Sequence, residues 1–324
     1  MAAGPDGLPF ARGHGTQNDF VVVPDPDGTL DLAPAAVAAL CHRRAGIGGD
    51  GLLRVVRSRD LPEGLAQAGD AEWFMDYRNA DGSLAEMCGN GVRVFAAYLL
   101  RHGLARLGRG ETLAVGTRAG VKTVRRDGEW FAVDLGPWFL PGGADAVESG
   151  GDVEVDVAGE PVTLPGLRVD VGNPHVVVTL PGVGVLRRVD LAREPVVHPE
   201  PVDGANVEIV VPAPERDGVG HLAMRVHERG VGETRSCGTG AVAAVLATRV
   251  WGGPGAPGEW TVDVPGGRLR VGVPAADRFR GDRVELAGPA VIVAEGTVDA
   301  GWLAAVTDDA GRAGAGQRPT RSTR

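Results

Sequence analysis

Short segments in which apolar and polar residues alternate dominate the chain between residues 19 and 298. They are rich in β-branched residues and are bounded by Gly, Pro or Asp, which is typical of antiparallel strands with one buried face. The 51 Gly and 23 Pro residues supply the many turns that such strands need. Examples of the expected strands are residues 19–23, 51–56, 130–135, 153–157, 176–180, 207–211, 260–264 and 283–287.

Three segments have helical spacing instead. Residues 34–44 begin with a proline suited to a first helical turn, and residues 90–102 place Val92, Phe95 and Leu99 on one face. Residues 239–251 are apolar on nearly every face. A helix of that kind must be covered on all sides. Because strands are the other abundant element, we expect a curved sheet to wrap it.

The two later helices begin with the same motif. Residues 88–91 read Cys-Gly-Asn-Gly and residues 237–240 read Cys-Gly-Thr-Gly. Asn79 stands nine residues before the first cysteine, and Glu228 stands nine residues before the second. The two motifs are about one domain length apart, which indicates an internal repeat. We therefore expect an α+β fold of two pseudo-symmetric domains, each a curved, mainly antiparallel sheet wrapped around a central helix, with the two helix N-termini facing each other.

The repeat also predicts the domain boundaries. Residues 8–139 together with 287–305 are expected to form the N-terminal half, which carries Cys88. Residues 140–286 are expected to form the C-terminal half, which carries Cys237. Residues 306–324 are rich in Gly, Ala, Arg and Thr without apolar periodicity, so a disordered tail is expected there.

Charge and hydropathy exclude several classes of function. The chain has 33 Lys and Arg against 42 Asp and Glu, so no chain-wide basic surface is expected to bind nucleic acid or an anionic membrane. No apolar run approaches the roughly 20 residues of a membrane span. The first residues have neither the basic start nor the apolar core of a secretory signal. We expect a cytoplasmic protein with no nucleic-acid or membrane partner.

The three cysteines, Cys41, Cys88 and Cys237, form no close pair and are expected to be reduced. A cysteine just before a glycine-rich helix start gains the helix dipole and free backbone N–H groups, which favour the thiolate. The flanking glycines of Cys88 and Cys237 let a ligand approach the backbone closely. Cys41 lacks such glycines and is expected to be a buried packing residue.

Two thiols facing each other across an anion-binding gap suit one reaction in particular. One thiol removes a proton from one face of a carbon, and the other returns a proton to the opposite face. The helix N-termini would bind a carboxylate and stabilise the charge that builds as the α-carbon loses its proton. Three alternatives remain open: a redox disulfide, a zinc site, and a single nucleophilic cysteine with His175. A Cys-X-X-Cys pair or four ligands in tight pairs would be the usual signs of the first two.

Lys122 is the only lysine of the chain. Enzymes that use pyridoxal phosphate hold it as a lysine imine, so such chemistry would depend on this one residue. Residues 120–124 alternate like an edge strand, which favours a structural role for Lys122. We therefore predict a reaction with no cofactor and no metal.

The motifs together resemble those of the diaminopimelate epimerases, a family of cofactor-independent amino-acid epimerases with two cysteines. The resemblance covers roughly residues 8–304, and any one stretch alone would be modest support. The matching stretches, in the order of the family, are 14–20 (HGTQNDF), 46–51 (GIGGDG), 78–83 (RNADGS), 87–91 (MCGNG), 172–175 (GNPH), 205–207 (ANV), 227–230 (HERG), 233–240 (ETRSCGTG) and 264–267 (VPGG).

The resemblance implies interconversion of LL- and meso-2,6-diaminopimelate, on the route to lysine and peptidoglycan, by a homodimeric enzyme. It implies that Cys88 and Cys237 are the acid/base pair and that Asn18 helps to position the reacting end. The backbone amides implied to hold the reacting α-carboxylate are those of Gly89, Asn90, Gly238 and Thr239.

Further residues are implied to read the distal amino-acid end of the substrate. Arg229 would bind its carboxylate and Glu228 would lie near its ammonium, while His175 and Glu228 would tune the two thiols. From the residues alone, an Asn in a turn usually caps backbone, and Glu228 with Arg229 could be a surface ion pair. The residues implied to contact the distal end are Asn79, Asn173, Asn206, Glu228 and Arg229.

The chain departs from the family in a few places. Gly51 stands where some relatives carry a glutamine ligand, so a backbone contact or a water is expected to replace that side chain. Residues 1–7 precede the usual start, and residues 136–167 match little. A proline or hydroxyproline racemase of the same fold is the alternative. Such relatives typically have histidine in place of Asn90 and lack a distal clamp such as Asn79 with Arg229.

Overall fold

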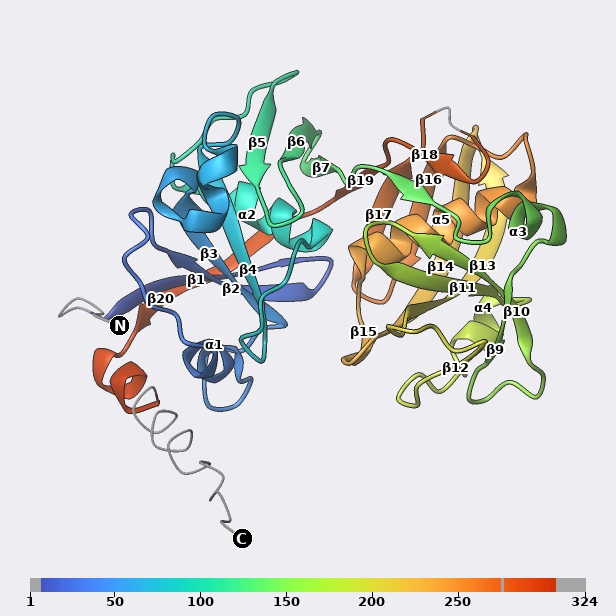
Figure 1. The fold of residues 1–324 in the computed structure, drawn as a ribbon, viewed down its shortest axis with the longest axis horizontal. Coiled ribbons are helices and arrows are strands. Elements are labelled where there is room, and N and C mark those ends of the chain that lie inside the picture. The colour runs from blue at the N-terminus through green and yellow to red at the C-terminus, as the bar shows by residue number, and fades with distance from the viewer. Residues whose placement is uncertain (1–6, 275–276, 307–324) are drawn as a thin grey trace, which may run out of the picture.

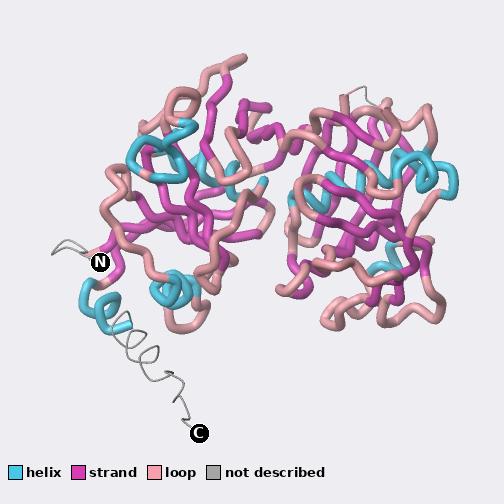
Figure 2. The backbone as a smooth tube through the Cα atoms, viewed as in Figure 1, coloured by secondary structure: helices cyan, strands magenta, loops and turns pink. Residues whose placement is uncertain are grey.

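The structure is a computed structural model that describes residues 7–274 and 277–306. Its strands and helices form two lobes, and the chain crosses from the second lobe back to the first near its C-terminal end (Figure 1). Figure 2 shows that strands surround a helix in each lobe. The α+β fold class predicted from the sequence is confirmed.

The first lobe is formed mainly by the chain from β1 to β7. Its elements are β1 (Leu8–Gly15), β2 (Asn18–Pro24), α1 (Pro34–Cys41), β3 (Gly51–Arg57), η1 (Ser58–Asp60), η2 (Pro62–Gln67), β4 (Trp73–Asn79), α2 (Gly89–Arg101), β5 (Thr112–Gly116), β6 (Lys122–Asp127) and β7 (Trp130–Asp134).

The second lobe is formed by the chain from β8 to β18. Its elements are β8 (Trp138–Phe139), α3 (Gly143–Ser149), β9 (Val153–Asp156), β10 (Leu164–Asp170), β11 (Pro174–Thr179), α4 (Val183–Leu186), β12 (Val196–His198), β13 (Asn206–Arg216), β14 (Val219–Glu228), β15 (Gly232–Thr234), α5 (Gly238–Gly252), β16 (Glu259–Val264), β17 (Gly267–Gly272) and β18 (Arg280–Gly281). The last two strands are β19 (Glu285–Gly288) and β20 (Val291–Val298).

Strand pairing repeats from one lobe to the other. In the first lobe, β1–β2 is antiparallel, β2–β3 parallel, β3–β4 antiparallel, β4–β5 parallel, and β5–β6 and β6–β7 antiparallel. In the second, β10–β11, β11–β13, β13–β14, β14–β16, β16–β17 and β17–β19 follow the same order of directions. Helices α2 and α5 occupy corresponding places, each before a parallel partner strand. The internal repeat inferred from the motifs therefore extends to topology.

β19 joins the two sheets because it pairs with β17 on one side and β7 on the other. β20 then pairs with β1. These pairings support the proposed boundaries, residues 8–139 with 287–305 and residues 140–286, which remain a proposal. The predicted tail begins one residue too early, because Val306 is helical together with residues 300–305. Residues 1–6 and the rest of the tail lie outside the described residues.

Each central helix is enclosed by its own sheet. α2 packs against β1 to β7, and α5 packs against β10, β11, β13, β14, β16 and β17. The apolar residues of α5 are buried on all its faces, as its sequence predicts. Burying each Val or Leu side chain contributes about 1.5–3 kcal/mol, so this helix is a main source of stability. Both helices belong to one continuous apolar core, which fixes their N-termini relative to each other.

The predicted strands and helices are all present, with ends that shift by a few residues. Both cysteine-bearing helices start one residue earlier than predicted, at Gly89 and Gly238. The prediction of an edge strand at residues 120–124 is wrong, because β6 pairs with β5 and with β7. Lys122 is buried there and donates from Nζ to the carbonyl of Leu135 at 3.0 Å.

Candidate active site

The two cysteines occupy equivalent positions in the two lobes. Cys88 is the N-cap residue of α2, and Cys237 is the N-cap residue of α5, both with extended backbone. The Sγ of Cys237 accepts a hydrogen bond from the backbone N–H of Gly240 at 3.4 Å. The first N–H groups of a helix have no partner within the helix, so each cysteine stands beside unpaired donors.

The starts of α2 and α5 lie against each other. A Cβ added to Gly89 would lie 3.0 Å from Leu286 Cδ2, and one added to Gly238 would lie 2.9 Å from the same atom. The Gly238 position is also 3.6 Å from the backbone N of Asn90. Asn90 Nδ2 donates to the carbonyl of Ser236 at 3.3 Å, directly before Cys237. The predicted meeting of the two helix N-termini is therefore present in the structure.

Asn18 lies next to Cys88, at the start of β2. Its Oδ1 lies 3.6 Å from Cys88 Sγ and accepts from Asn90 Nδ2 at 3.1 Å. Its Nδ2 donates to Asp50 Oδ2 at 2.8 Å. Asp50 precedes β3, which runs parallel to β2, so the starts of two neighbouring strands hold the amide in place. The structure thus brings Asn18, Cys88 and Asn90 together.

His175, Asn173 and a carboxylate form a second group beside Cys237. His175 is buried, with Nδ1 2.8 Å from Glu208 Oε1 and Nε2 3.1 Å from Asn173 Oδ1. A Cβ on Gly240 would lie 2.5 Å from Glu208 Oε1 and 3.2 Å from Cys237 Sγ, so the carboxylate and the sulfur flank one glycine. Thr239 Oγ1 lies 3.6 Å from the same sulfur.

The distal residues cluster at the end of β14. Asn206 Oδ1 accepts from the backbone N–H of Arg229 at 3.0 Å, and the Arg229 guanidinium is exposed and bonded to the carbonyl of Asp203. Glu228 accepts a short hydrogen bond from Thr234 Oγ1. Asn206, Glu228 and Arg229 are therefore neighbours, as the predicted roles require.

Two predicted distal residues have other partners: Asn173 contacts His175, and Asn79 is held within its own turn. It is exposed at the end of β4, and its Nδ2 donates to Ser83 Oγ at 3.0 Å. Across the described residues, no hydrogen bond joins it to Asn206 or Arg229. It nevertheless ends its strand as Glu228 ends β14, in line with the equal spacing to the cysteines.

The presence of glycine at position 51 has a structural explanation. Gly51 pairs with Asn79 across β3 and β4, and a Cβ there would lie 2.6 Å from the carbonyl O of Arg78 and 2.8 Å from the Tyr77 ring. Strand and ring leave no room for a longer side chain in this arrangement.

The protonation of the thiols differs from the sequence-based expectation. Burial raises the pKa of Cys88 to about 11, despite N–H groups of α2 that lower it. Burial also raises the pKa of Cys237 well above its usual value, and the carboxylates of Glu228 and Glu208 add to the rise. The predicted lowering by the helix N-terminus is therefore outweighed by desolvation. Both sulfurs are thiols at neutral pH in this state.

Glu228 has an unusual pKa as well. Burial raises it to about 7, and the hydrogen bond from Thr234 only partly offsets this rise. The charge of Glu228 in turn contributes to the raised pKa of Cys88 and of Cys237. One carboxylate that titrates near neutrality therefore acts on both sulfurs, which fits a group that exchanges protons with its surroundings.

Several residues of the site were not singled out from the sequence, among them Glu208, Arg93 and Tyr77. Glu208 stands between apolar residues of β13, and Arg93 stands between apolar residues of α2. A lone charge in a buried segment was the signal that could have identified both. Tyr77, on β4, has a pKa raised by burial and by the charges of Cys88, Glu228, Asp50 and Cys237.

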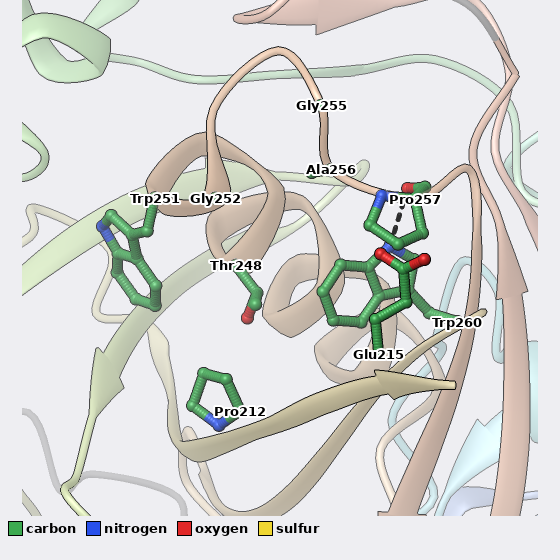
Figure 3. A pocket seen from close by; sticks show the side chains of 9 residues that line it. All are labelled: Pro212, Glu215, Thr248, Trp251, Gly252, Gly255, Ala256, Pro257 and Trp260. Atoms are coloured by element: carbon green, nitrogen blue, oxygen red, sulfur yellow. Dashed lines mark hydrogen bonds between the residues drawn. The ribbon is translucent and has the colours of Figure 1, made fainter. Parts of the chain in front are cut away.

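Other features lie apart from this cluster. Cys41 is buried in an apolar cluster between α1 and the neighbouring strands, as predicted. The pocket in Figure 3 lies at the C-terminal end of α5, between Trp251 and Trp260, and contains none of the predicted site residues. Within the described residues, every helix is too short or too polar to cross a bilayer.

Comparison with known proteins identifies the family. The family model described as diaminopimelate epimerase matches residues 10–140 and 167–293. The chain belongs to the diaminopimelate epimerase family. It is therefore an isomerase of the epimerase type. The gap between the matched ranges, residues 141–166, falls in the stretch where the sequence motifs matched little.

Relatives in this family are similar over nearly their whole length. The diaminopimelate epimerase of Streptomyces coelicolor is 51% identical over 92% of this chain and 98% of its own. That of Thermobifida fusca is 49% identical over 89% of this chain and 97% of its own.

Solved structures with low sequence identity share the fold. A PhzF-family protein of Bacillus anthracis has a TM-score of 0.60 at 18% identity and covers 90% of this chain and 99% of its own. A hydroxyproline epimerase of Agrobacterium vitis, with bound trans-4-hydroxy-L-proline, has a TM-score of 0.59 at 13% identity, over 92% of this chain and 94% of its own.

Proposed function

We propose that the chain interconverts LL- and meso-2,6-diaminopimelate, with Cys88 and Cys237 as the acid and base on opposite faces of the α-carbon. The observation that carries this proposal is the contact between the two helix starts, each capped by one cysteine. A single base cannot reach both faces of a carbon, whereas two sulfurs on facing helices can. The similarity to named diaminopimelate epimerases supports this choice of substrate.

The reacting α-carboxylate binds between the helix N-termini. Its ligands are backbone N–H groups from both helices. Those of Gly89 and Asn90 belong to α2, and those of Gly238 and Thr239 belong to α5. As the α-carbon loses its proton, charge moves onto the carboxylate. Two helix dipoles and their free N–H groups stabilise that charge at the place where it develops.

The distal amino-acid end binds to the residues around Arg229. The backbone of Arg229 is held by Asn206, so its guanidinium is placed at the surface, where a carboxylate can reach it. Asn79 and Asn173 complete this end, and Asn18 orients the reacting end beside Cys88. A second amino-acid group on the substrate is thereby distinguished from the simple side chain of alanine or proline.

The active form needs one thiolate and one thiol. Because both sulfurs are protonated in the free protein, a proton must leave one of them when the substrate binds. Glu228, with a pKa of about 7, accepts this proton, and His175 holds the carboxylate of Glu208 beside Cys237. The sulfur that acts as the base for one stereoisomer acts as the acid for the other.

Serine variants test the mechanism. Cys88→Ser and Cys237→Ser each leave a much poorer base on one face, so epimerisation should slow by at least about 10²–10⁴-fold. Cys41→Ser is the control and should react at the native rate. In deuterated water, early deuterium should enter mainly the product isomer, because donor and acceptor are different groups.

Two results would contradict the proposal. One is a native rate for Cys237→Ser in both directions. The other is α-proton exchange with proline that equals or exceeds exchange with diaminopimelate, which would favour the racemase alternative instead. Activity that disappears in chelator and reductant would favour a metal or disulfide function.

We further propose a homodimer that works in the cytoplasm, on the route to lysine and peptidoglycan precursors. Support for the dimer comes from β20, which among the described strands pairs only with β1 and exposes Val291 and Val293. An open edge of this kind can pair with a second copy. Sedimentation should give twice the chain mass of 33.4 kDa, and Val293→Glu should shift it toward the monomer.

A further inference from the structure

Arg93 is a completely buried guanidinium on α2, behind the start of the helix. Its Nη2 donates to Asn90 Oδ1 at 2.6 Å. Its Nε and Nη1 have no hydrogen-bond partner, and it forms no ion pair within the part of the chain that the structure describes. Burial lowers its pKa to about 10, so it stays charged at neutral pH. A buried charge left without a counter-ion is costly, and buried groups with shifted pKa values cluster at functional sites.

The surrounding backbone is shaped around this group. A Cβ on Gly15 would lie 2.9 Å from Arg93 Nη2, and a Cβ on Gly288 would lie 3.0 Å from Arg93 Cζ. Gly15 ends β1 and Gly288 ends β19, so strands from distant parts of the chain leave space for the guanidinium. Side chains at either position would displace it.

Arg93 determines the orientation of a chain of amides. An arginine can only donate, so Asn90 must present its oxygen to Arg93 and its nitrogen to Asn18 and Ser236. At the other end, the carboxylate of Asp50 accepts from the nitrogen of Asn18. The two amides are therefore oriented by Arg93 at one end of this row of hydrogen bonds and by Asp50 at the other. The same amides contact Cys88 and the residue before Cys237.

The charge of Arg93 also acts on one thiol. It lowers the pKa of Cys88, against burial and the carboxylate of Glu228, which raise it. The pKa of Cys237 is raised by burial and by the carboxylates of Glu228 and Glu208. Near the two cysteines, the described residues include three other charged or titratable groups: Tyr77 on β4, Asp50 before β3 and His175 on β11.

We propose that Arg93 is a positioning residue that fixes the Asn90 amide between the two helix starts and places an unpaired, buried positive charge on the helix that Cys88 caps. The proposal rests on the proposed two-cysteine function. Arg93 itself does not touch the substrate. It acts through Asn90, Asn18 and its own buried charge, all of which are within the protein.

Alkylation of the native protein by iodoacetamide, without substrate, tests this proposal. Peptide mass analysis gives the separate rates at Cys88 and Cys237. Arg93→Met removes donor and charge, so alkylation of Cys88 at pH 9 should slow about tenfold, while that of Cys237 changes less than threefold. Arg93→Lys keeps a donor and a titratable positive charge, so it should label Cys88 faster than Arg93→Met does, and the recovery should grow as the pH is lowered below 9. In turnover, kcat should fall more than KM rises.

An unchanged ratio of the two alkylation rates in Arg93→Met, or a lysine variant no better than methionine, would overturn the proposal. If Arg93→Met does not fold, as judged by its melting curve, Arg93→Gln compared with Arg93→Lys makes the same test, because glutamine keeps a donor without charge. Alkylation does not depend on turnover. A native protein that fails to epimerise diaminopimelate therefore refutes the proposed function and leaves the Arg93 result readable.

Discussion

Replacing Glu228 with glutamine should make both site cysteines more reactive while slowing epimerisation. The Glu228 carboxylate is one cause of the raised pKa of Cys88 and of Cys237, after burial. A nearby like charge shifts a pKa by about one unit or more, which is about 1.4 kcal/mol. For Cys88, a fall from about 11 by one unit raises the thiolate fraction at pH 9 from about 1% to about 9%. Alkylation of Cys88 should then be roughly tenfold faster.

The difference in alkylation rate between the native protein and Glu228→Gln should depend on pH. Glu228 has a pKa of about 7, so its negative charge is present above pH 7 and lost below it. Native protein and Glu228→Gln should therefore alkylate at similar rates at pH 6 and diverge as the pH rises through 7. Epimerisation by the variant should be slow throughout, because glutamine cannot accept a proton.

The assay is iodoacetamide labelling from pH 6 to pH 10, with the modified peptides quantified by mass spectrometry. Glu233→Gln is the matched control, since Glu233 lies on β15 nearby but pairs with Arg225. Its labelling rates should equal those of the native protein. Equal rates for Glu228→Gln and native protein at pH 9, or an acceleration of the same size at pH 6, would refute the reasoning.

Three further changes test other parts of the site. Arg229→Ala should raise KM for diaminopimelate by roughly 10–100-fold, because a charge-assisted bond of about 1.5–3 kcal/mol is lost, and an unchanged KM would place Arg229 outside the site. Gly240→Ala puts a Cβ 2.5 Å from Glu208 Oε1 and should lower kcat at least about tenfold, whereas Gly255→Ala, with open space around it, should not. Lys122→Ala should keep native activity in colourless protein without added metal or pyridoxal phosphate. An aldimine absorbance that disappears together with activity in this variant would contradict a cofactor-free reaction.

The sequence by itself determined the elements, the repeat and the two cysteines that stand at the starts of the central helices. Periodicity depends on which face of a segment is buried, so the alternating strands and the apolar helix 239–251 could be recognised locally. Glycines around Cys88 and Cys237 mark helix starts for a physical reason that needs no tertiary context. The equal spacing of Asn79 and Glu228 from these cysteines identified corresponding strand ends in the two lobes.

Only the tertiary structure decided which groups act on each sulfur. Desolvation depends on what packs around an atom, and for both thiols it outweighs the helix dipole that local sequence predicts. The place of Glu208 beside Cys237 likewise depends on long-range packing, because Glu208 lies on β13 and its partner His175 lies on β11. The contact of Asn90 with Ser236 joins the two halves of the chain, which local sequence cannot show. Lys122 shows the same limit, since an alternating strand looks alike in sequence whether it lies at the edge of a sheet or, like β6, between two partners.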